Sequence, residues 1–280
     1  MAQNPRVGSP LSLTYAPPMA VGTSEEPAPN GRESEPGARQ AVLFRLRDAL
    51  GKLSGAQKST VGVPAYLRFV NRRVGGWLAA AGYGLGLTPN HLTALSAGFS
   101  FIAIGALTVA DPTPAVAVGI ALSLLVGYAF DSADGQLSRV RGGGKPSGEW
   151  LDHVVDVAKT ASLHAAVVVS LVRFGDLQGN RWLALPLAFG VINITFFFAM
   201  MLRDQLGAKP LRGAGPPTAT GAGSVLRSFV LLPMDYGTLC MVFFALSAPP
   251  VFLTLYGALF AAMVAFTAQS FVKAYRALDA

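Results

Sequence analysis

The sequence predicts an all-α integral membrane protein with six transmembrane helices, preceded by an interfacial amphipathic helix. Of its 280 residues, 52% are hydrophobic and only 13% are charged, whereas about a quarter of the residues in an average soluble domain carry charge. Six stretches are also long and apolar enough to cross a bilayer, which requires roughly 20 residues. They cover residues 90–110, 114–138, 149–173, 182–202, 226–246 and 250–272.

The first sixty residues have a different composition from the rest of the chain. They are rich in Pro, Gly, Ser, Glu and Arg and contain few apolar residues. Such a segment cannot bury enough apolar surface to fold by itself. We therefore expect residues 1–60 to form a disordered cytoplasmic segment, with at most a short helix near residues 42–53, and residues 62–276 to form the membrane domain.

The interfacial helix is predicted from the sequence "PAYLRFVNRRVGGWLAAAG", residues 64–82. Arg68 and Arg72 are four residues apart and share a helix face, while apolar residues such as Val74 and Trp77 lie largely on other faces. This pattern is typical of a helix that lies in the headgroup layer of a membrane. A seventh, partial span is the alternative interpretation.

The distribution of Lys and Arg predicts the orientation of the spans. Basic residues gather before the first span, between the second and third, between the fourth and fifth, and after the sixth. The positive-inside rule then places both termini and the loop between the second and third spans on the cytoplasmic side of the cytoplasmic membrane. Because the net charge of +7 belongs mainly to this membrane-facing surface, we expect membrane lipids as partners and no nucleic acid. The basic residues in question are Arg68, Arg72, Arg73, Arg139, Arg141, Lys145, Arg203, Lys209, Arg212, Arg227, Lys273 and Arg276.

Four aspartates lie where the second span ends and the third begins. Asp131 and Asp134 are three residues apart and Asp152 and Asp156 are four apart, so each pair shares one helix face. Carboxylates at membrane depth are costly and usually functional. Four of them cannot all stay ionised in one site of low dielectric constant without cations. Mg²⁺ or Mn²⁺, which prefer oxygen ligands and retain positions for substrate phosphates, are the expected cations.

The neighbouring residues are suited to a phosphate ligand. Gly135 leaves the backbone open to a substrate, and Arg139, about one turn later, can bind a phosphate with two parallel donors. Gly148 lies near the start of the third span, where a helix N-terminus favours anions.

These residues together resemble the signature of the CDP-alcohol phosphotransferase (phosphatidyltransferase) family, D-x2-D-G-x2-A-R-x8-G-x3-D-x3-D. Every spacing of the signature is met, and the single departure is Ser138 in place of the usual Ala. Outside the signature the likeness is architectural and covers about residues 62–276. The matching residues are Asp131, Asp134, Gly135, Arg139, Gly148, Asp152 and Asp156.

The resemblance implies specific roles for these residues. The family uses an alcohol to displace CMP from a CDP-linked alcohol, with two divalent metal ions, Mg²⁺ or Mn²⁺. By likeness, the metal ligands are Asp131, Asp134, Asp152 and Asp156, and Asp156 also acts as the base on the acceptor hydroxyl. The CDP-alcohol would be bound by Asp131, Asp134, Gly135, Ser138, Arg139 and Gly148. A homodimer is implied as well.

The residues that bind the acceptor alcohol are less sharply indicated. Lys159 lies three residues after Asp156, so it either pairs with Asp156 or binds the acceptor. Arg203, Lys209 and Arg212 follow the fourth span, and are either an anion pocket for the acceptor or ordinary positive-inside charges.

Several other polar residues lie near the spans. We expect His153 to border the site and His164 to serve as an internal hydrogen-bond partner. Asn90 could cap the first span or, like Thr93, border the nucleotide; Thr88 is the other candidate cap. Asp235, after Pro233, could cap a kink or close the site.

The predicted function is transfer of a phosphatidyl or substituted phospho-alcohol group from a CDP-alcohol to an acceptor hydroxyl with release of CMP, in phospholipid biosynthesis. CDP-diacylglycerol is the favoured donor, because an interfacial site lets its acyl chains remain in the bilayer. The alternative is a CDP-linked polar headgroup with a lipid or polyol acceptor. A Mg²⁺-dependent membrane prenyltransferase and an ion transporter are further alternatives. The first would need different aspartate spacing and more spans, and the second would not need Gly135, Arg139 and Gly148 at these separations.

Overall fold

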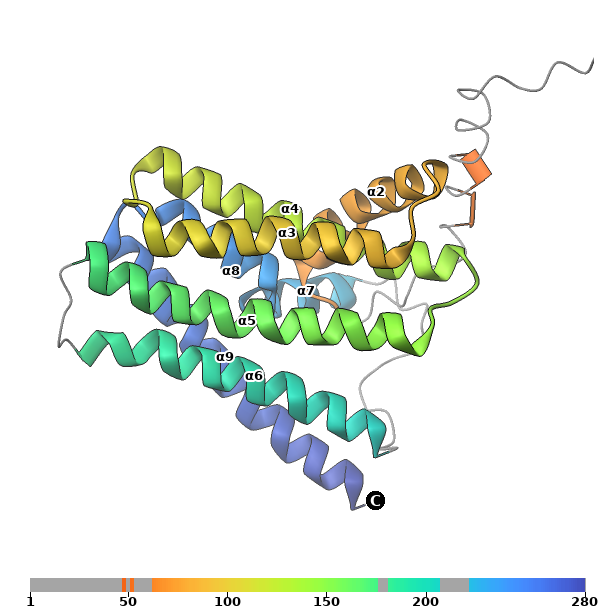
Figure 1. Ribbon diagram of the computed structural model, residues 1–280. Coiled ribbons are helices and arrows are strands. Elements are labelled where there is room, and N and C mark those ends of the chain that lie inside the picture. The colour runs from red at the N-terminus through yellow and green to blue at the C-terminus, as the bar shows by residue number, and fades with distance from the viewer. Residues whose placement is uncertain (1–46, 49–50, 53–61, 176–180, 207–221, 280) are drawn as a thin grey trace, which may run out of the picture. The chain divides into compact units, whose positions relative to one another are not determined.

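The computed structural model describes residues 47–48, 51–52, 62–175, 181–206 and 222–279. Every regular element within these ranges is a helix (Figure 1). The described residues among the first sixty, 47–48 and 51–52, are helical and fall inside the short helix predicted near residues 42–53. The remainder of the predicted disordered segment lies outside the described residues.

Three long helices carry the signature and its surroundings: α3 (Pro89–Val109), α4 (Pro114–Val140) and α5 (Pro146–Phe174). Each begins with proline, whose fixed φ suits the first helical position and whose missing N–H is not needed there. The Oγ1 atom of Thr88 accepts a hydrogen bond from the backbone N–H of His91, so Thr88 rather than Asn90 caps α3. The bounds of all three helices lie within a few residues of the predicted spans.

Two further long helices complete the set that can cross a membrane. After a short 3₁₀ turn, η2 (Arg181–Leu183), comes α6 (Ala184–Gln205), and the chain ends with α9 (Pro249–Leu278). With α3, α4 and α5 they give five helices in the described part of the chain that are long and apolar enough to span a bilayer. The chain is thus an all-α integral membrane protein.

The predicted span 226–246 is not one continuous helix. It is built from α7 (Ala222–Val230), η3 (Leu232–Met234), α8 (Tyr236–Val242) and η4 (Phe243–Ala245). Pro233 cannot donate to a continuous helical ladder, and the Asp235 Oδ1 atom accepts from Gly237 N at 2.9 Å, which starts a new helix. Asp235 therefore caps α8 after the kink at Pro233. Of the two roles predicted for Asp235, this is the one that the structure confirms. The count of six spans stays a prediction.

The long helices pack side by side in pairs. Figure 1 shows α3 beside α4 and α5 beside α3, while α6 packs against both α5 and α9. α4 also packs against α2 and α8. A glycine permits the close approach of α3 and α4, because a Cβ atom on Gly127 would lie 2.5 Å from Ser100 Oγ and 3.1 Å from the carbonyl oxygen of Ser96.

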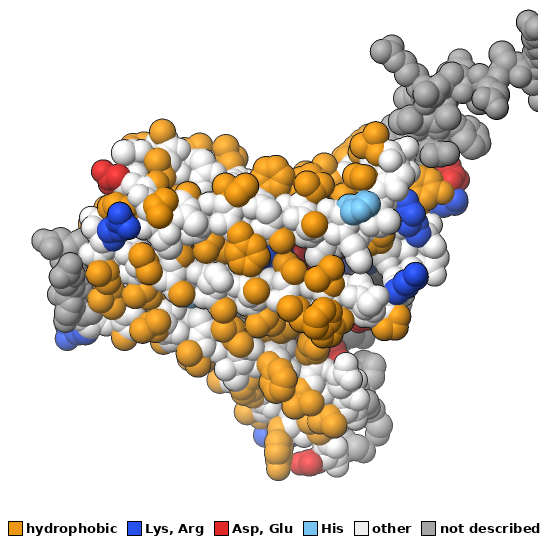
Figure 2. Space-filling model, viewed as in Figure 1, with side chains coloured by type: hydrophobic (Ala, Val, Ile, Leu, Met, Phe, Trp, Pro, Cys, Tyr) orange, Lys and Arg blue, Asp and Glu red, His pale blue; other side chains and the backbone are white. Residues whose placement is uncertain are grey.

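The apolar side chains are divided between a buried core and an exposed belt. The core joins α3, α4, α5, α6, α8, η4 and α9, and its largest fully buried side chains include Leu124, Leu163, Phe243 and Phe252. Figure 2 shows hydrophobic side chains across the middle of the visible face, with charged side chains mainly toward its ends. An exposed apolar surface of this extent fits contact with lipid.

The segment predicted as an interfacial helix is helical: η1 (Leu67–Asn71), one turn of π-helix, is followed by α2 (Arg72–Gly84). One face packs on α4, where Gln136 Nε2 donates to the Arg72 carbonyl oxygen at 3.0 Å. On another face the side chain of Trp77 is 65% exposed. The amphipathic character of this helix and its place in the headgroup layer stay predictions.

A buried polar contact joins three helices away from the signature. His164 of α5 is hydrogen-bonded to the hydroxyl of Tyr256 in α9, and Asn193 Nδ2 of α6 lies 2.9 Å from His164 Nε2. The prediction that His164 is an internal hydrogen-bond partner is confirmed.

Candidate active site

The four aspartates of the signature lie close together on α4 and α5. Asp134 is buried and the other three carboxylates are half-buried. The negative charge of Asp134 interacts with those of Asp131 and Asp152, and the charge of Asp156 interacts with the same two. Each carboxylate therefore repels two others, and the four form an aspartate ring of Asp131, Asp134, Asp152 and Asp156.

α3 contributes a supporting hydroxyl to this aspartate ring. The Thr93 Oγ1 atom donates to Asp134 Oδ2 at 2.6 Å. This bond fixes the carboxylate of Asp134 in one orientation, as a partner of a metal-binding carboxylate does. Thr93 thus serves as a support for Asp134, a role that sequence reasoning did not assign to it.

Lys159 lies within the aspartate ring. Its Nζ atom is 2.6 Å from Asp131 Oδ1 and 2.7 Å from Asp156 Oδ1, and it donates to Ser96 Oγ at 3.2 Å. The residue is only 5% exposed. The ion pair predicted between Lys159 and Asp156 is present, and it extends to Asp131 on the neighbouring helix.

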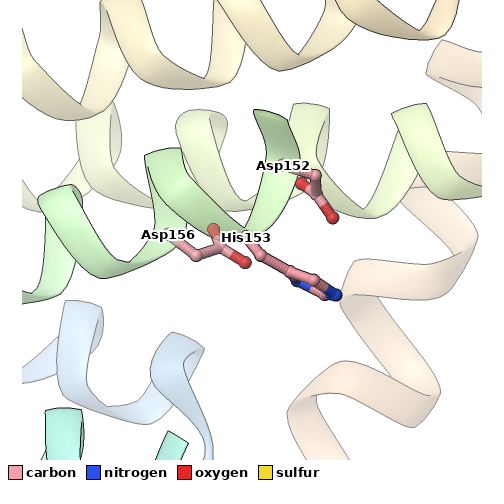
Figure 3. Close-up of side chains that lie close together, drawn as sticks. All are labelled: Asp152, His153 and Asp156. Atoms are coloured by element: carbon pink, nitrogen blue, oxygen red, sulfur yellow. The ribbon is translucent and has the colours of Figure 1, made fainter. Parts of the chain in front are cut away.

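Figure 3 shows Asp152, His153 and Asp156 on one stretch of α5. One ligand atom from each of the three lies within 4.8 Å of the other two. The ring of His153 also meets the ring of Phe197 edge-on, with centroids 5.7 Å apart. His153 therefore borders the carboxylates, as predicted.

The donor atoms suit a hard divalent cation. Carboxylate oxygens that repel one another are stabilised by a cation placed between them, and Mg²⁺ and Mn²⁺ prefer such oxygen ligands. The aspartate ring thus fits the metal ions that the resemblance implies.

Arginine side chains gather next to the aspartate ring. Arg139 Nη1 lies 3.5 Å from the position that a Cβ atom on Gly135 would occupy, so the guanidinium lies over the glycine. Burial lowers the pKa of Arg72, and the positive charges of Arg139 and Arg68 act in the same direction. Arg72 of α2, which sequence reasoning did not single out as a site residue, therefore adds to a basic region that can attract a phosphate.

The loop between α4 and α5 lies beside the start of α3. Gly142 and Gly143 have φ angles of +91° and +114°, which favour glycine, and they let the chain reverse between the helices. A Cβ atom on Gly148 would lie 3.1 Å from Asn90 Oδ1, so Asn90 borders this part of the site. Because α5 begins at Pro146, Gly148 is its third residue and lies near the start of the helix, as predicted.

Ser138 contacts the same loop. A Cβ atom on Gly144 would lie 2.8 Å from Ser138 Oγ, and the Gly143 backbone N–H donates to the Ser138 carbonyl oxygen at 3.0 Å. The side chain that replaces the usual alanine is thus next to the turn that connects the two aspartate pairs.

The residues predicted to bind the acceptor are only partly described. Arg203 Nη1 pairs with Asp204 Oδ1 at 2.8 Å, and the side chain of Arg203 is 10% exposed. Lys209 and Arg212 lie outside the described residues. Their shared role as an acceptor pocket stays a prediction.

Sequence reasoning also missed a polar hub around Asp235, which includes Tyr128 of α4. Asp235 Oδ2 accepts from the backbone N–H of Leu67 at 2.7 Å, and Asp235 Oδ1 accepts from the Tyr128 hydroxyl at 3.2 Å. Tyr128 lies three residues before Asp131, so this hub connects the interfacial helix, α8 and the aspartate-bearing part of α4. An aspartate two residues after Pro233, within an apolar segment, was the sequence signal for it.

A sequence model of the family described as CDP-alcohol phosphatidyltransferase matches residues 86–269. The match covers more than half of the chain and includes all of the signature. The chain belongs to the CDP-alcohol phosphatidyltransferase family. The protein is therefore a CDP-alcohol phosphotransferase of phospholipid biosynthesis, which acts on a CDP-alcohol and requires divalent metal. The family resemblance seen in the sequence is confirmed.

Solved structures give the same fold. The phosphatidylinositol phosphate synthase of Mycobacterium tuberculosis with CDP-DAG bound aligns with a TM-score of 0.51 and 17% identity, over 74% of this chain and 94% of that chain. A structure of the same synthase in complex with manganese and citrate aligns with a TM-score of 0.50 and 17% identity, over 71% of this chain and 87% of that chain. None of the curated proteins matches the chain in sequence.

Proposed function

We propose that this phosphotransferase moves a phosphatidyl group from CDP-diacylglycerol to the hydroxyl of an acceptor alcohol and releases CMP. Family membership supports the reaction type. The donor is supported by the position of the aspartate ring near the ends of α4 and α5, beside the predicted interfacial helix, because a donor bound there could keep its acyl chains in the bilayer. The structurally similar synthase was solved with CDP-DAG bound, which agrees with this donor.

Asp131, Asp134, Asp152 and Asp156 would hold two divalent cations, Mg²⁺ or Mn²⁺. The observation that carries this assignment is the aspartate ring itself, since each carboxylate repels two others. When bound, such cations neutralise a pyrophosphate and stabilise the oxygen that leaves it. The similar synthase was also solved in complex with manganese.

The remaining chemistry falls to residues of the chain. Asp156 accepts the proton of the acceptor hydroxyl, whose oxygen attacks the phosphorus that carries the diacylglycerol. The bond from this phosphorus to the bridging oxygen breaks, and CMP leaves with the electron pair. Positioning and charge neutralisation, more than covalent catalysis, accelerate such phosphoryl transfer. Gly135, Ser138, Arg139 and Gly148 would line the CDP-alcohol site.

The acceptor is an alcohol whose identity is open. Lys159, Arg203, Lys209 and Arg212 are the candidate acceptor-binding residues, and a basic pocket would favour a phosphorylated polyol. The reverse assignment, a CDP-linked polar headgroup with a lipid acceptor, uses the same aspartate ring. We also propose a homodimer in the cytoplasmic membrane, with the aspartate ring and both termini facing the cytoplasm.

The test is CMP release by the purified protein. It should be incubated with labelled CDP-diacylglycerol and a panel of alcohols that includes inositol phosphate, glycerol phosphate, serine and other polyols, with Mg²⁺ or Mn²⁺. We expect metal-dependent CMP release with one acceptor class. A second arm pairs CDP-linked polar alcohols with lipid acceptors, and activity only in that arm would overturn the proposed donor. Activity with an isoprenyl diphosphate and none with any CDP-alcohol would overturn the reaction itself.

A further inference from the structure

We propose that Lys159 is a positioning residue of the metal site. Its ammonium ties one oxygen of Asp131 to one oxygen of Asp156 and leaves the second oxygen of each carboxylate to a divalent cation. The inference deepens the proposed function and depends on its assignment of the aspartate ring to divalent cations.

The contacts of Lys159 fit a fixed ammonium. An ammonium group has three N–H donors, and Lys159 Nζ has three oxygen partners: Asp131 at 2.6 Å, Asp156 at 2.7 Å and Ser96 at 3.2 Å. Both carboxylates bind it through Oδ1. The residue is buried, so these three bonds satisfy the group without water.

This arrangement differs from an ordinary ion pair along one helix. The pair with Asp156 is local, since the two residues are three apart on α5. The bonds to Asp131 and Ser96 reach α4 and α3. Lys159 therefore joins the three helices that build the site, and its positive charge offsets the repulsion between Asp131 and Asp156.

Partners that orient metal-binding side chains typically change metal affinity by about 10- to 100-fold. We expect an effect of this size from Lys159. The opposite interpretation is that the ammonium occupies a cation position and competes with the metal, in which case its removal would strengthen metal binding. A direct role in acceptor binding would require the ammonium to give up one of its three bonds. These interpretations can be separated by measuring metal affinity.

The experiment titrates Mn²⁺ into the full-length protein in detergent and follows free Mn²⁺ by electron paramagnetic resonance. The Lys159→Met variant, which keeps a long side chain without the charge, should bind Mn²⁺ about 10- to 100-fold more weakly than the unsubstituted protein. Unchanged affinity, tighter binding or an additional bound ion in Lys159→Met would overturn the inference. Folded, unsubstituted protein that binds no Mn²⁺ would instead overturn the proposed metal site.

Two further variants guard against a general loss of structure. Asn193→Leu removes the partly buried hydrogen bond to His164, away from the aspartate ring; it should lower the melting temperature without changing Mn²⁺ affinity. Ser96→Ala removes one neutral partner of the ammonium and keeps every charge. If Lys159→Met does not fold, Ser96→Ala should still weaken Mn²⁺ binding, to a smaller extent, and unaltered affinity in this variant would contradict the inference.

Discussion

Asp156 and Asp131 both bind Lys159, but their proposed roles differ. Asp156 is the proposed base, so Asp156→Asn should reduce kcat by about 10²- to 10⁴-fold, the usual contribution of a positioned base. Binding of the CDP-alcohol should be largely retained, because Asp156 is not among the residues assigned to the CDP-alcohol and the other three carboxylates of the aspartate ring remain. CMP release measures the first effect and calorimetric titration with CDP-diacylglycerol the second. A variant with a normal rate would remove Asp156 from the role of base.

Asp131 is a proposed metal ligand shared with Lys159. Asp131→Asn should abolish metal-dependent CMP release, because the amide lacks the negative charge that a hard cation needs. Asp111→Asn is the matched control, since Asp111 is exposed in the loop between α3 and α4 and lies outside the signature. If Asp131→Asn showed the same Mg²⁺ or Mn²⁺ dependence as the unsubstituted protein, Asp131 would not belong to the ligand set.

At the scale of single residues, spacing was enough to find the carboxylates but not their partners. The intervals between Asp131, Asp134, Asp152 and Asp156 predicted two pairs that face one another, and the aspartate ring has this form. Thr93 and Ser96 could not be assigned in the same way, because hydroxyls in apolar helices most often bond within their own helix. Only the packing of α3 against α4 and α5 brings Thr93 to Asp134 and Ser96 to Lys159.

At the scale of elements, the contact of α3 with α4 depends on Gly127. Gly127→Ala would place its Cβ atom 3.1 Å from the backbone oxygen of Ser96 and 2.5 Å from Ser100 Oγ, so one of the helices has to move. Overpacking of this kind costs about 1–3 kcal/mol. We therefore expect a lower melting temperature in detergent, and lower activity because Ser96 belongs to the site.

Gly119→Ala is the matched control for that substitution. Gly119 lies on the same helix, and a Cβ atom there would have nothing within 4 Å. Alanine favours a helix over glycine by up to about 1 kcal/mol, so this variant should be as stable as the unsubstituted protein or slightly more so. Equal melting temperatures for the two alanine variants would show that close packing at Gly127 is not important.

Where a helix runs without interruption, its first and last residues could be predicted from the sequence to within a few residues. The prolines that open α3, α4, α5 and α9 mark their starts. The segment 226–246 was predicted as one span because the apolar residues around Pro233 and Asp235 outweigh these two in an average over the segment. The break itself comes from Pro233 and from the cap that Asp235 forms on Gly237. The further contacts of Asp235 with the Leu67 backbone and with Tyr128 are distant in sequence and could not be predicted.

At the scale of the whole molecule, the orientation of the spans can be tested with single cysteines. Cys240 is the only cysteine of the chain and is buried, so Cys240→Ser gives a suitable background. In intact cells, Asp111→Cys should react with an impermeant maleimide, and Lys145→Cys should react only after the membrane is opened. Labelling of Lys145→Cys from outside would reverse the proposed orientation.

The same background tests the number of spans. Ala248, exposed just before α9, lies on the outer side if the segment 226–246 crosses the membrane. Ala248→Cys should then be labelled in intact cells to the same extent as Asp111→Cys. Protection of Ala248→Cys together with labelling of Asp111→Cys would mean that the broken segment does not cross.

The sequence alone determined the class of protein, the long helices and the acidic signature, because apolar length, proline positions and residue spacing act locally along the chain. Tertiary structure decided which side chains support the signature: Thr93 on Asp134, Lys159 on Asp131 and Ser96, and Asp235 on Leu67 and Tyr128. These contacts join residues from different helices. Their geometry depends on how closely the helices approach one another, which no pattern within a single helix specifies.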